Sequence, residues 1–80
     1  MKNIYRKWIG ERLKYFRDLL KLDQSQFAAM IGKTRQCYAA YEEGRAEPAI
    51  FTLKQICDIH SITVDKFLEG SPAGALNTEC

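Results

Sequence analysis

The sequence has almost none of the residues needed for a metal site, a disulfide framework or a membrane span. Its 80 residues include a single histidine, His60, and three widely spaced cysteines, Cys37, Cys57 and Cys80, with no C-x-x-C pair. Zinc sites need several such ligands at short spacings, and disulfide frameworks need paired cysteines. No apolar run approaches the roughly 18 to 20 residues of a membrane span, and the basic N-terminus lacks the apolar segment of a secretion signal. We therefore expect no metal, no cofactor, no membrane association and a cytoplasmic protein.

Groups typical of enzyme active sites are equally scarce. The chain has one histidine, no pair of carboxylates at a useful spacing and no glycine-rich loop that could hold a phosphate. Acid–base catalysis and nucleotide chemistry depend on such groups. We therefore predict that the protein is not an enzyme.

The sequence also has no strand pattern, no internal repeat and no low-complexity tract. Its 80 residues suit one small domain, and its 46% hydrophobic and 28% charged residues are typical of a globular chain. We predict an all-α fold, a compact bundle of five short helices, within a domain of residues 1–70. Residues 71–80 are mostly small or polar, so we expect them to form a mobile tail.

The net charge is only +2, but the charge is unevenly distributed. Residues 1–22 carry seven Lys/Arg against two Asp/Glu, a net of +5, whereas residues 23–48 carry three against four and residues 49–80 carry two against four. A basic N-terminal helix could contact phosphates, and a solvated helix face would explain the same pattern. Charge alone leaves both interpretations open.

The most informative stretch runs from Asp23 to Gly44. Asp23 and Gln26 have the spacing of a capping box at a helix start, and Gly32 can adopt the positive φ that ends a helix abruptly. Thr34 is a good N-cap for a second helix. The pattern predicts two short helices joined by a sharp turn, which is the layout of a helix-turn-helix DNA reader.

The first turn of that second helix carries side chains suited to base recognition. Arg35 and Gln36 can make bidentate hydrogen bonds to guanine and adenine respectively. Phe27 and Tyr38 lie on apolar faces that we expect to pack the two helices together.

Amphipathic patterns flank this stretch on both sides. They predict one helix over residues 5–20 and two more over residues 50–60 and 64–69. Thr63 is a good cap for the helix at 64–69, whereas Ala49 is a poor cap for the helix at 50–60. The residues expected on the inner faces of the first two are Ile9, Leu13, Phe16, Leu20, Ile50, Leu53, Ile56 and Cys57.

Residues 9–68 as a whole resemble the Cro-and-repressor (xenobiotic-response-element-like) helix-turn-helix family of phage and bacterial regulators. The segments that carry the resemblance, all in the family's register, are 9–17, 22–32, 34–44, Pro48, 52–57 and 62–68. The resemblance implies a lambda-repressor-like bundle whose third helix lies in the major groove of double-stranded DNA. It also implies a homodimer that binds an inverted-repeat operator and controls transcription.

The resemblance further assigns roles to single residues. The family's glutamine at the start of helix 2 falls on Gln24, which implies a phosphate contact and support for the first side chain of the recognition helix. The base-reading positions fall on Thr34, Arg35, Gln36 and Ala40. Arg45 matches a loop position that commonly meets the DNA backbone. The family's arginine on helix 1 and glutamate at the end of helix 3 fall on Arg17 and Glu42, which implies a structural ion pair.

A few positions depart from the family pattern. Lys21 stands where a turn glycine is usual. Lys33 stands where many relatives carry an apolar residue that packs into the turn between the two helices. We expect Lys33 to reach a phosphate instead. Ala39 and Ala40 are small where many relatives carry polar readers. Direct readout would then depend on few side chains, with indirect readout adding to it.

The leading hypothesis is a sequence-specific DNA-binding transcriptional regulator, expected to be a repressor, in which the cations of the first helix, with Lys33 and Arg45, hold phosphates. The alternative is an antitoxin or phage accessory protein whose main role is to bind a partner protein.

Trp8, Leu19 and Phe51 are apolar residues left outside the expected core. We hypothesise that some of them contribute to self-association.

Overall fold

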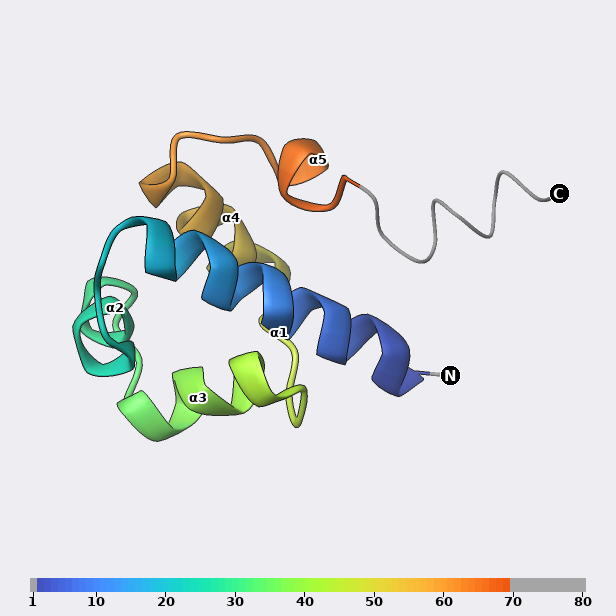
Figure 1. The fold of residues 1–80 in the computed structure, drawn as a ribbon, viewed down its shortest axis with the longest axis horizontal. Helices are drawn as coiled ribbons and strands as arrows, with labels where there is room; N and C mark the ends of the chain where they lie inside the picture. The colour runs from blue at the N-terminus through green and yellow to red at the C-terminus, as the bar shows by residue number, and fades with distance from the viewer. Residues whose placement is uncertain (1, 70–80) are drawn as a thin grey trace, which may run out of the picture.

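The computed structural model describes residues 2–69, which form five helices and no strand, as an all-α fold requires. The helices are α1 (Lys2–Leu19), α2 (Gln24–Met30), α3 (Arg35–Glu43), α4 (Ile50–Ile59) and α5 (Val64–Phe67). α1 runs along the length of the molecule, with α3 on one side of it and α4 and α5 on the other (Figure 1). The expected tail of residues 71–80 lies outside the described residues, as does Cys80.

The predicted caps of α2, α3 and α5 are confirmed, whereas α1 begins at Lys2, before the predicted start at residue 5. The Asp23 carboxylate accepts a hydrogen bond from the Gln26 backbone N–H at 2.8 Å, and Gln26 Oε1 accepts one from the Asp23 N–H at 2.9 Å, which completes the capping box of α2. Thr34 caps α3 and Thr63 caps α5 in the same way, through their hydroxyl oxygens. Ala49 makes no side-chain cap for α4. Side-chain caps therefore mark the starts of α2, α3 and α5.

The turn between α2 and α3 depends on glycine. Gly32 has a φ of 69° and Gly44, which ends α3, has a φ of 78°, both in the left-handed region where a Cβ is disfavoured. Lys21, at the turn between α1 and α2, has a φ of 58° although it carries a side chain. Lys21 therefore adopts the conformation for which glycine is usual.

A single core joins the helices. Phe27 and Tyr38 pack α2 against α3 with ring centroids 5.3 Å apart, and Phe16 of α1 stacks on Phe67 of α5 at 5.5 Å. The fully buried large side chains are Tyr38, Phe27, Phe67, Leu13, Ile56 and Cys57. This core holds the outer face of α3 rigidly with respect to α1.

Two expectations about the core helices were wrong. α1 ends at Leu19, so Leu20 leaves the buried stripe and is 40% exposed. Ile50, expected on the inner face of α4, is 64% exposed because it occupies the first turn, beyond the packed part of the helix. Trp8, expected outside the core, is half-buried, and the guanidinium of Arg12 lies over its ring at 5.6 Å. Each difference arises from contacts between helices rather than from helical periodicity.

Residues 2–69 offer neither a membrane span nor a cluster of metal ligands. None of their helices is long and apolar enough to cross a membrane. No group of three or more His, Cys, Asp and Glu side chains among them is arranged to hold a metal ion.

Candidate nucleic-acid interface

The outer face of α3 begins with exposed polar side chains. Arg35 and Gln36 occupy the first turn of the helix and are exposed, while Ala40, one turn further, is half-buried. Ala39 is 4% exposed and belongs to the inner face of α3, so it is not available as a reader. The face available to a groove is therefore narrow and is polar mainly at its start.

Behind this face lies the ion pair of Arg17 and Glu42. Arg17 Nε donates to Glu42 Oε2 at 2.6 Å and Nη2 donates to Oε1 at 3.1 Å, while Nη1 donates to the Leu22 carbonyl oxygen at 2.7 Å. The two side chains are only 10% and 5% exposed. A buried, bidentate pair of this kind is costly to break on one side only, because the remaining charge stays buried without a partner. It fixes α1 to the end of α3.

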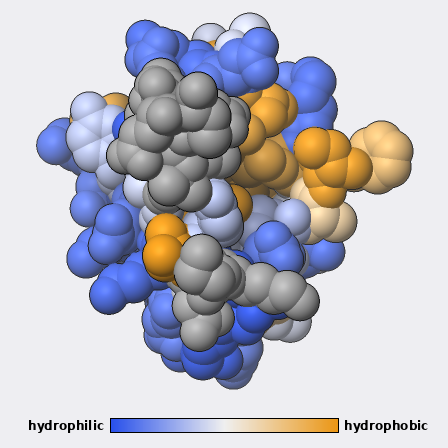
Figure 2. Space-filling model, turned by 90° about the vertical axis from the view of Figure 1, so that its right-hand side faces the viewer, coloured by the Kyte–Doolittle hydropathy of each residue, from blue (hydrophilic) through white to orange (hydrophobic). Residues whose placement is uncertain are grey.

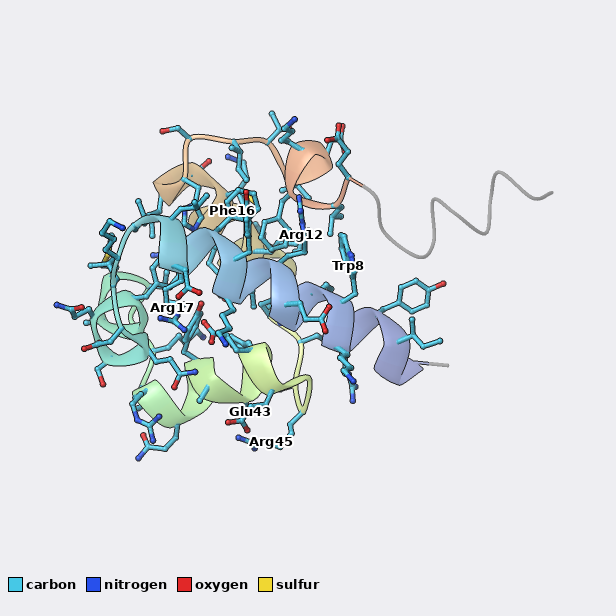
Figure 3. All side chains as sticks on the ribbon, in the orientation of Figure 1. Trp8, Arg12, Phe16, Arg17, Glu43 and Arg45 are labelled. Atoms are coloured by element: carbon cyan, nitrogen blue, oxygen red, sulfur yellow. The ribbon has the colours of Figure 1, made fainter. Side chains whose placement is uncertain are left out.

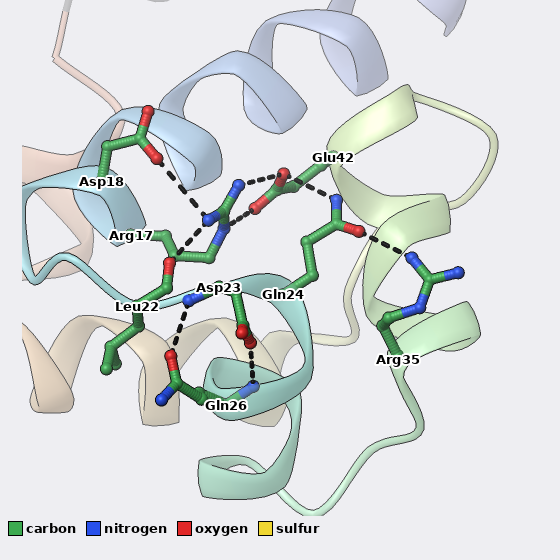
Figure 4. A network of polar contacts seen from close by, with 8 residues as sticks. All are labelled: Arg17, Asp18, Leu22, Asp23, Gln24, Gln26, Arg35 and Glu42. Atoms are coloured by element: carbon green, nitrogen blue, oxygen red, sulfur yellow. Dashed lines mark hydrogen bonds and ion pairs between the residues drawn. The ribbon is translucent and has the colours of Figure 1, made fainter.

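Two further hydrogen bonds connect this pair to the surface. Gln24 Nε2 donates to Glu42 Oε1 at 3.0 Å, and Arg35 Nη1 donates to Gln24 Oε1 at 3.0 Å (Figure 4). The side chains of Arg17, Glu42, Gln24 and Arg35 thus form one continuous polar chain from α1 through α3 and α2 to the exposed start of α3.

The charges of Arg17 and Glu42 are stabilised in their ionised forms. Burial alone would raise the pKa of the Glu42 carboxyl, but the hydrogen bonds from Arg17 and Gln24 and the neighbouring Tyr38 hydroxyl outweigh burial, and the pKa of Glu42 is lowered. The hydrogen bond to Glu42 raises the pKa of Arg17 against the opposing effect of burial. Burial, followed by the nearby Glu42 carboxylate, raises the pKa of Tyr38, so its phenol stays protonated.

The remaining predicted contact residues lie around the start and end of α3. Thr34 uses its hydroxyl oxygen to accept from the Cys37 N–H at 3.1 Å, and its side chain is exposed. Lys33, in the turn, is half-buried. Arg45, after the end of α3, is exposed but donates to the neighbouring Glu43 carboxylate at 2.7 Å (Figure 3). Sequence reasoning did not single out Glu43, although it stands only two positions before Arg45.

The cations of α1 differ from the expected phosphate-binding set. Arg17 is buried in the ion pair with Glu42. Arg12 donates from Nε to the Phe67 carbonyl oxygen at 2.9 Å and lies over the Phe16 ring at 5.1 Å, between α1 and α5 (Figure 3). The ion pair of Arg17 is the one predicted, whereas Arg12, one of the cations expected to contact phosphates, instead binds α1 to α5. The periodicity of α1 placed Arg12 off the apolar stripe but could not show that the end of α5 lies over it.

One residue essential to this arrangement, Gly10, was overlooked in the sequence. It lies on α1 under the end of α3, where a Cβ would come within 2.4 Å of the Glu42 carbonyl oxygen. A lone glycine inside a helical pattern is the signal that could have revealed this close approach.

The chain matches a known family over most of its length. The family model described as helix-turn-helix (HTH_3) matches residues 13–67. This range begins within α1 and includes the whole of α2, α3, α4 and α5. No solved structure gives a significant match.

Two regulators of Bacillus subtilis (strain 168) are similar in sequence. The SPbeta prophage-derived uncharacterized HTH-type transcriptional regulator YonR is 41% identical over 64 residues, which cover 80% of this chain and 59% of the relative. The uncharacterized HTH-type transcriptional regulator YqaE is 42% identical over 61 residues, which cover 76% of this chain and 53% of the relative. The chain thus spans somewhat more than half the length of these relatives. It belongs to the Cro-and-repressor type of the helix-turn-helix family.

Proposed function

We propose that the protein is a sequence-specific DNA-binding transcriptional regulator that acts as a repressor, with α3 in the major groove of double-stranded DNA. The observation that carries this proposal is the exposed first turn of α3, where Arg35 is held by Gln24 and stands next to Gln36. Arginine and glutamine are the side chains that make bidentate contacts to guanine and adenine. The two Bacillus relatives, both named as transcriptional regulators, support the same role.

In this proposal the contacts divide into two kinds. Arg35 and Gln36 read base edges, with Ala40 close enough to touch a thymine methyl group. The phosphate contacts come from residues around them: Gln24, Lys33, Thr34 and Arg45. Because Arg12 and Arg17 are engaged within the fold, the positive charge available for DNA is smaller than the composition of α1 suggests.

The direct test is selection of bound duplexes from a random-sequence pool at about 150 mM salt, where purely electrostatic binding is weakened. We expect an enriched inverted repeat, and we expect Arg35→Ala to lose the preference at one base pair of each half-site. A pool that returns no motif would contradict sequence-specific binding and would favour a role in binding a partner protein.

We further propose that the protein binds as a homodimer through the start of α4. Phe51 is 84% exposed and its neighbour Ile50 is 64% exposed. Apolar side chains project from an otherwise largely hydrophilic surface on the face shown in Figure 2. A contiguous apolar patch on the surface of a small domain is a candidate site of protein–protein contact.

Sedimentation measures the dimer directly. Phe51→Glu is expected to shift the protein to monomer, whereas Leu19→Glu, which places the same charge at another exposed apolar residue on α1, is expected to leave the dimer intact. A dimer that survives Phe51→Glu and dissociates on Leu19→Glu would move the interface to α1.

A further inference from the structure

The amide of Gln24 lies between two groups of opposite hydrogen-bonding capacity. An ionised carboxylate can only accept hydrogen bonds, and a guanidinium can only donate them. Glu42 Oε1 is 3.0 Å from Gln24 Nε2, and Arg35 Nη1 is 3.0 Å from Gln24 Oε1 (Figure 4). Only one of the two orientations of the amide satisfies both neighbours. In the flipped orientation, the amide NH₂ would face the guanidinium and its oxygen would face the carboxylate.

The Glu42 carboxylate is itself held in place. Its oxygens accept from Arg17 Nε at 2.6 Å and from Nη2 at 3.1 Å. Arg17 is in turn fixed by the Leu22 carbonyl oxygen at 2.7 Å. Since the Glu42 side chain is 5% exposed and its pKa is lowered, it stays charged and keeps its acceptor role at neutral pH. The fixed end of the polar chain is therefore in the protein interior.

We propose that Glu42 is a positioning residue for base readout. Through the Gln24 amide it presents a hydrogen-bond acceptor to Arg35 and so holds the guanidinium in one conformation before DNA arrives. The inference rests on the proposed function and deepens it, because it assigns to the buried ion pair a role in specificity in addition to its role in stability.

The geometry leaves Arg35 able to read a base while it is held. One N–H of Nη1 is used by Gln24 Oε1. The guanidinium has five N–H donors, so the edge formed by Nε and Nη2 remains free for the two acceptors of guanine. Ordering a long side chain in advance removes an entropic cost that would otherwise oppose binding. The expected gain is about three- to tenfold in discrimination at the base pair that Arg35 reads.

The first experiment measures side-chain order by ¹⁵N NMR in the free protein, without DNA. We expect the Arg35 Nε order parameter to be high in the wild type and to fall below about 0.6, the flexible range, in Gln24→Met and in Glu42→Gln. Glu43→Gln is the matched control, because Glu43 is the next residue on α3 and pairs with Arg45 instead. An Arg35 side chain that is as mobile in the wild type as in Gln24→Met would overturn the proposal.

The direction of the effect can be tested even if Glu42→Gln unfolds through loss of the buried pair. Arg35→Ala removes only an exposed side chain and leaves Glu42 and Gln24 together. We expect the Gln24 side-chain amide to stay ordered in Arg35→Ala. If the amide becomes mobile instead, Arg35 holds Gln24 rather than the reverse, and Glu42 is not the positioning residue.

Binding experiments then separate this inference from the proposed function. The ratio of dissociation constants for the selected duplex and for a duplex changed at the base pair read by Arg35 is expected to fall about three- to tenfold in Gln24→Met and to remain unchanged in Glu43→Gln. An unchanged ratio in Gln24→Met would overturn the inference while leaving sequence-specific binding intact. Failure of the wild type to prefer any sequence would overturn the proposed function, whereas the order parameters would still decide whether Glu42 positions Arg35.

Discussion

Gly10 of α1 lies directly against the main chain of Glu42 at the end of α3. A Cβ at Gly10 would come within 2.4 Å of the Glu42 carbonyl oxygen and within 2.7 Å of the Tyr41 carbonyl oxygen. Both are backbone atoms and cannot swing aside as a flexible side chain would. The absence of a side chain at Gly10 therefore sets how closely α1 approaches α3, and so whether Arg17 of α1 can reach the Glu42 carboxylate.

Gly10→Ala is expected to destabilise the fold although alanine favours helices more than glycine does. The gain in helix propensity is about 1 kcal/mol, and the forced separation of the helices costs more than that, for a net loss of about 1–3 kcal/mol. Urea unfolding measures the change, and Glu11→Ala, an exposed neighbour on α1, serves as the control with a change within about 0.5 kcal/mol. Equal stability of Gly10→Ala and the wild type would contradict the close approach.

The parts of the fold that sequence predicted are those set by local chemistry. Asp23 with Gln26, Thr34 and Thr63 each satisfy backbone N–H groups within three residues of themselves, so their pattern is readable without knowledge of the rest of the fold. The residue range of the helix-turn-helix followed from these caps and from Gly32. Amphipathic patterns predicted the helices that flank it, and the family resemblance implied that the third helix lies in the major groove.

The parts that sequence did not predict depend on contacts between distant segments. Arg12 meets the end of α5 more than fifty residues away in the chain, which no pattern within α1 can reveal. Ile50 fits the apolar period of α4 but lies beyond the part that other helices cover. The polar chain behind Arg35 shows the same limit, because the bond between Gln24 and Glu42 joins residues eighteen positions apart.

Lys21 is a site where a substitution should stabilise the protein. Its φ of 58° is in the left-handed region, which costs a residue with a Cβ roughly 1–2 kcal/mol relative to glycine. Lys21→Gly is expected to raise the free energy of unfolding by about 0.5–1 kcal/mol, since the greater freedom of glycine in the unfolded chain offsets part of the gain. Lys21→Ala removes the same charge but keeps the Cβ, so it is expected to give no such gain in the same unfolding experiment.

His60 should make the stability of the fold depend on pH. Its ring stacks on Phe27 with centroids 5.5 Å apart and lies 5.2 Å from the Phe16 ring, and burial lowers its pKa from the ordinary value of 6.5. The unfolded chain then binds a proton more readily than the folded chain does. Stability is therefore fully present above about pH 6.5 and is lost as the pH falls toward the folded pKa, at no more than about 1.4 kcal/mol per pH unit.

Urea unfolding at several pH values between roughly 7.5 and 5, the range in which histidine titrates, tests this dependence. His60→Phe keeps an aromatic ring in the same place and removes the titrating group, so its stability is expected to vary much less over that range. A wild type whose stability is constant between these pH values would show that the ring is protonated as easily in the folded protein as in the unfolded chain.

Glu43 is expected to weaken DNA binding in the wild type, and its neutralisation should strengthen it. Its carboxylate holds Arg45 Nε at 2.7 Å on the surface of the molecule, where the arginine would otherwise be free to meet a phosphate. Glu43→Gln removes this competition and one negative charge near the DNA, so we expect affinity to rise about two- to fivefold at low salt. Asp58→Asn is the matched control, because Asp58 also forms an exposed ion pair at 2.7 Å, with Lys54, but lies on α4. Fluorescence anisotropy with the selected duplex measures the affinity of both variants. An equal rise in affinity in both would mean that net charge alone is responsible and that Arg45 makes no specific phosphate contact.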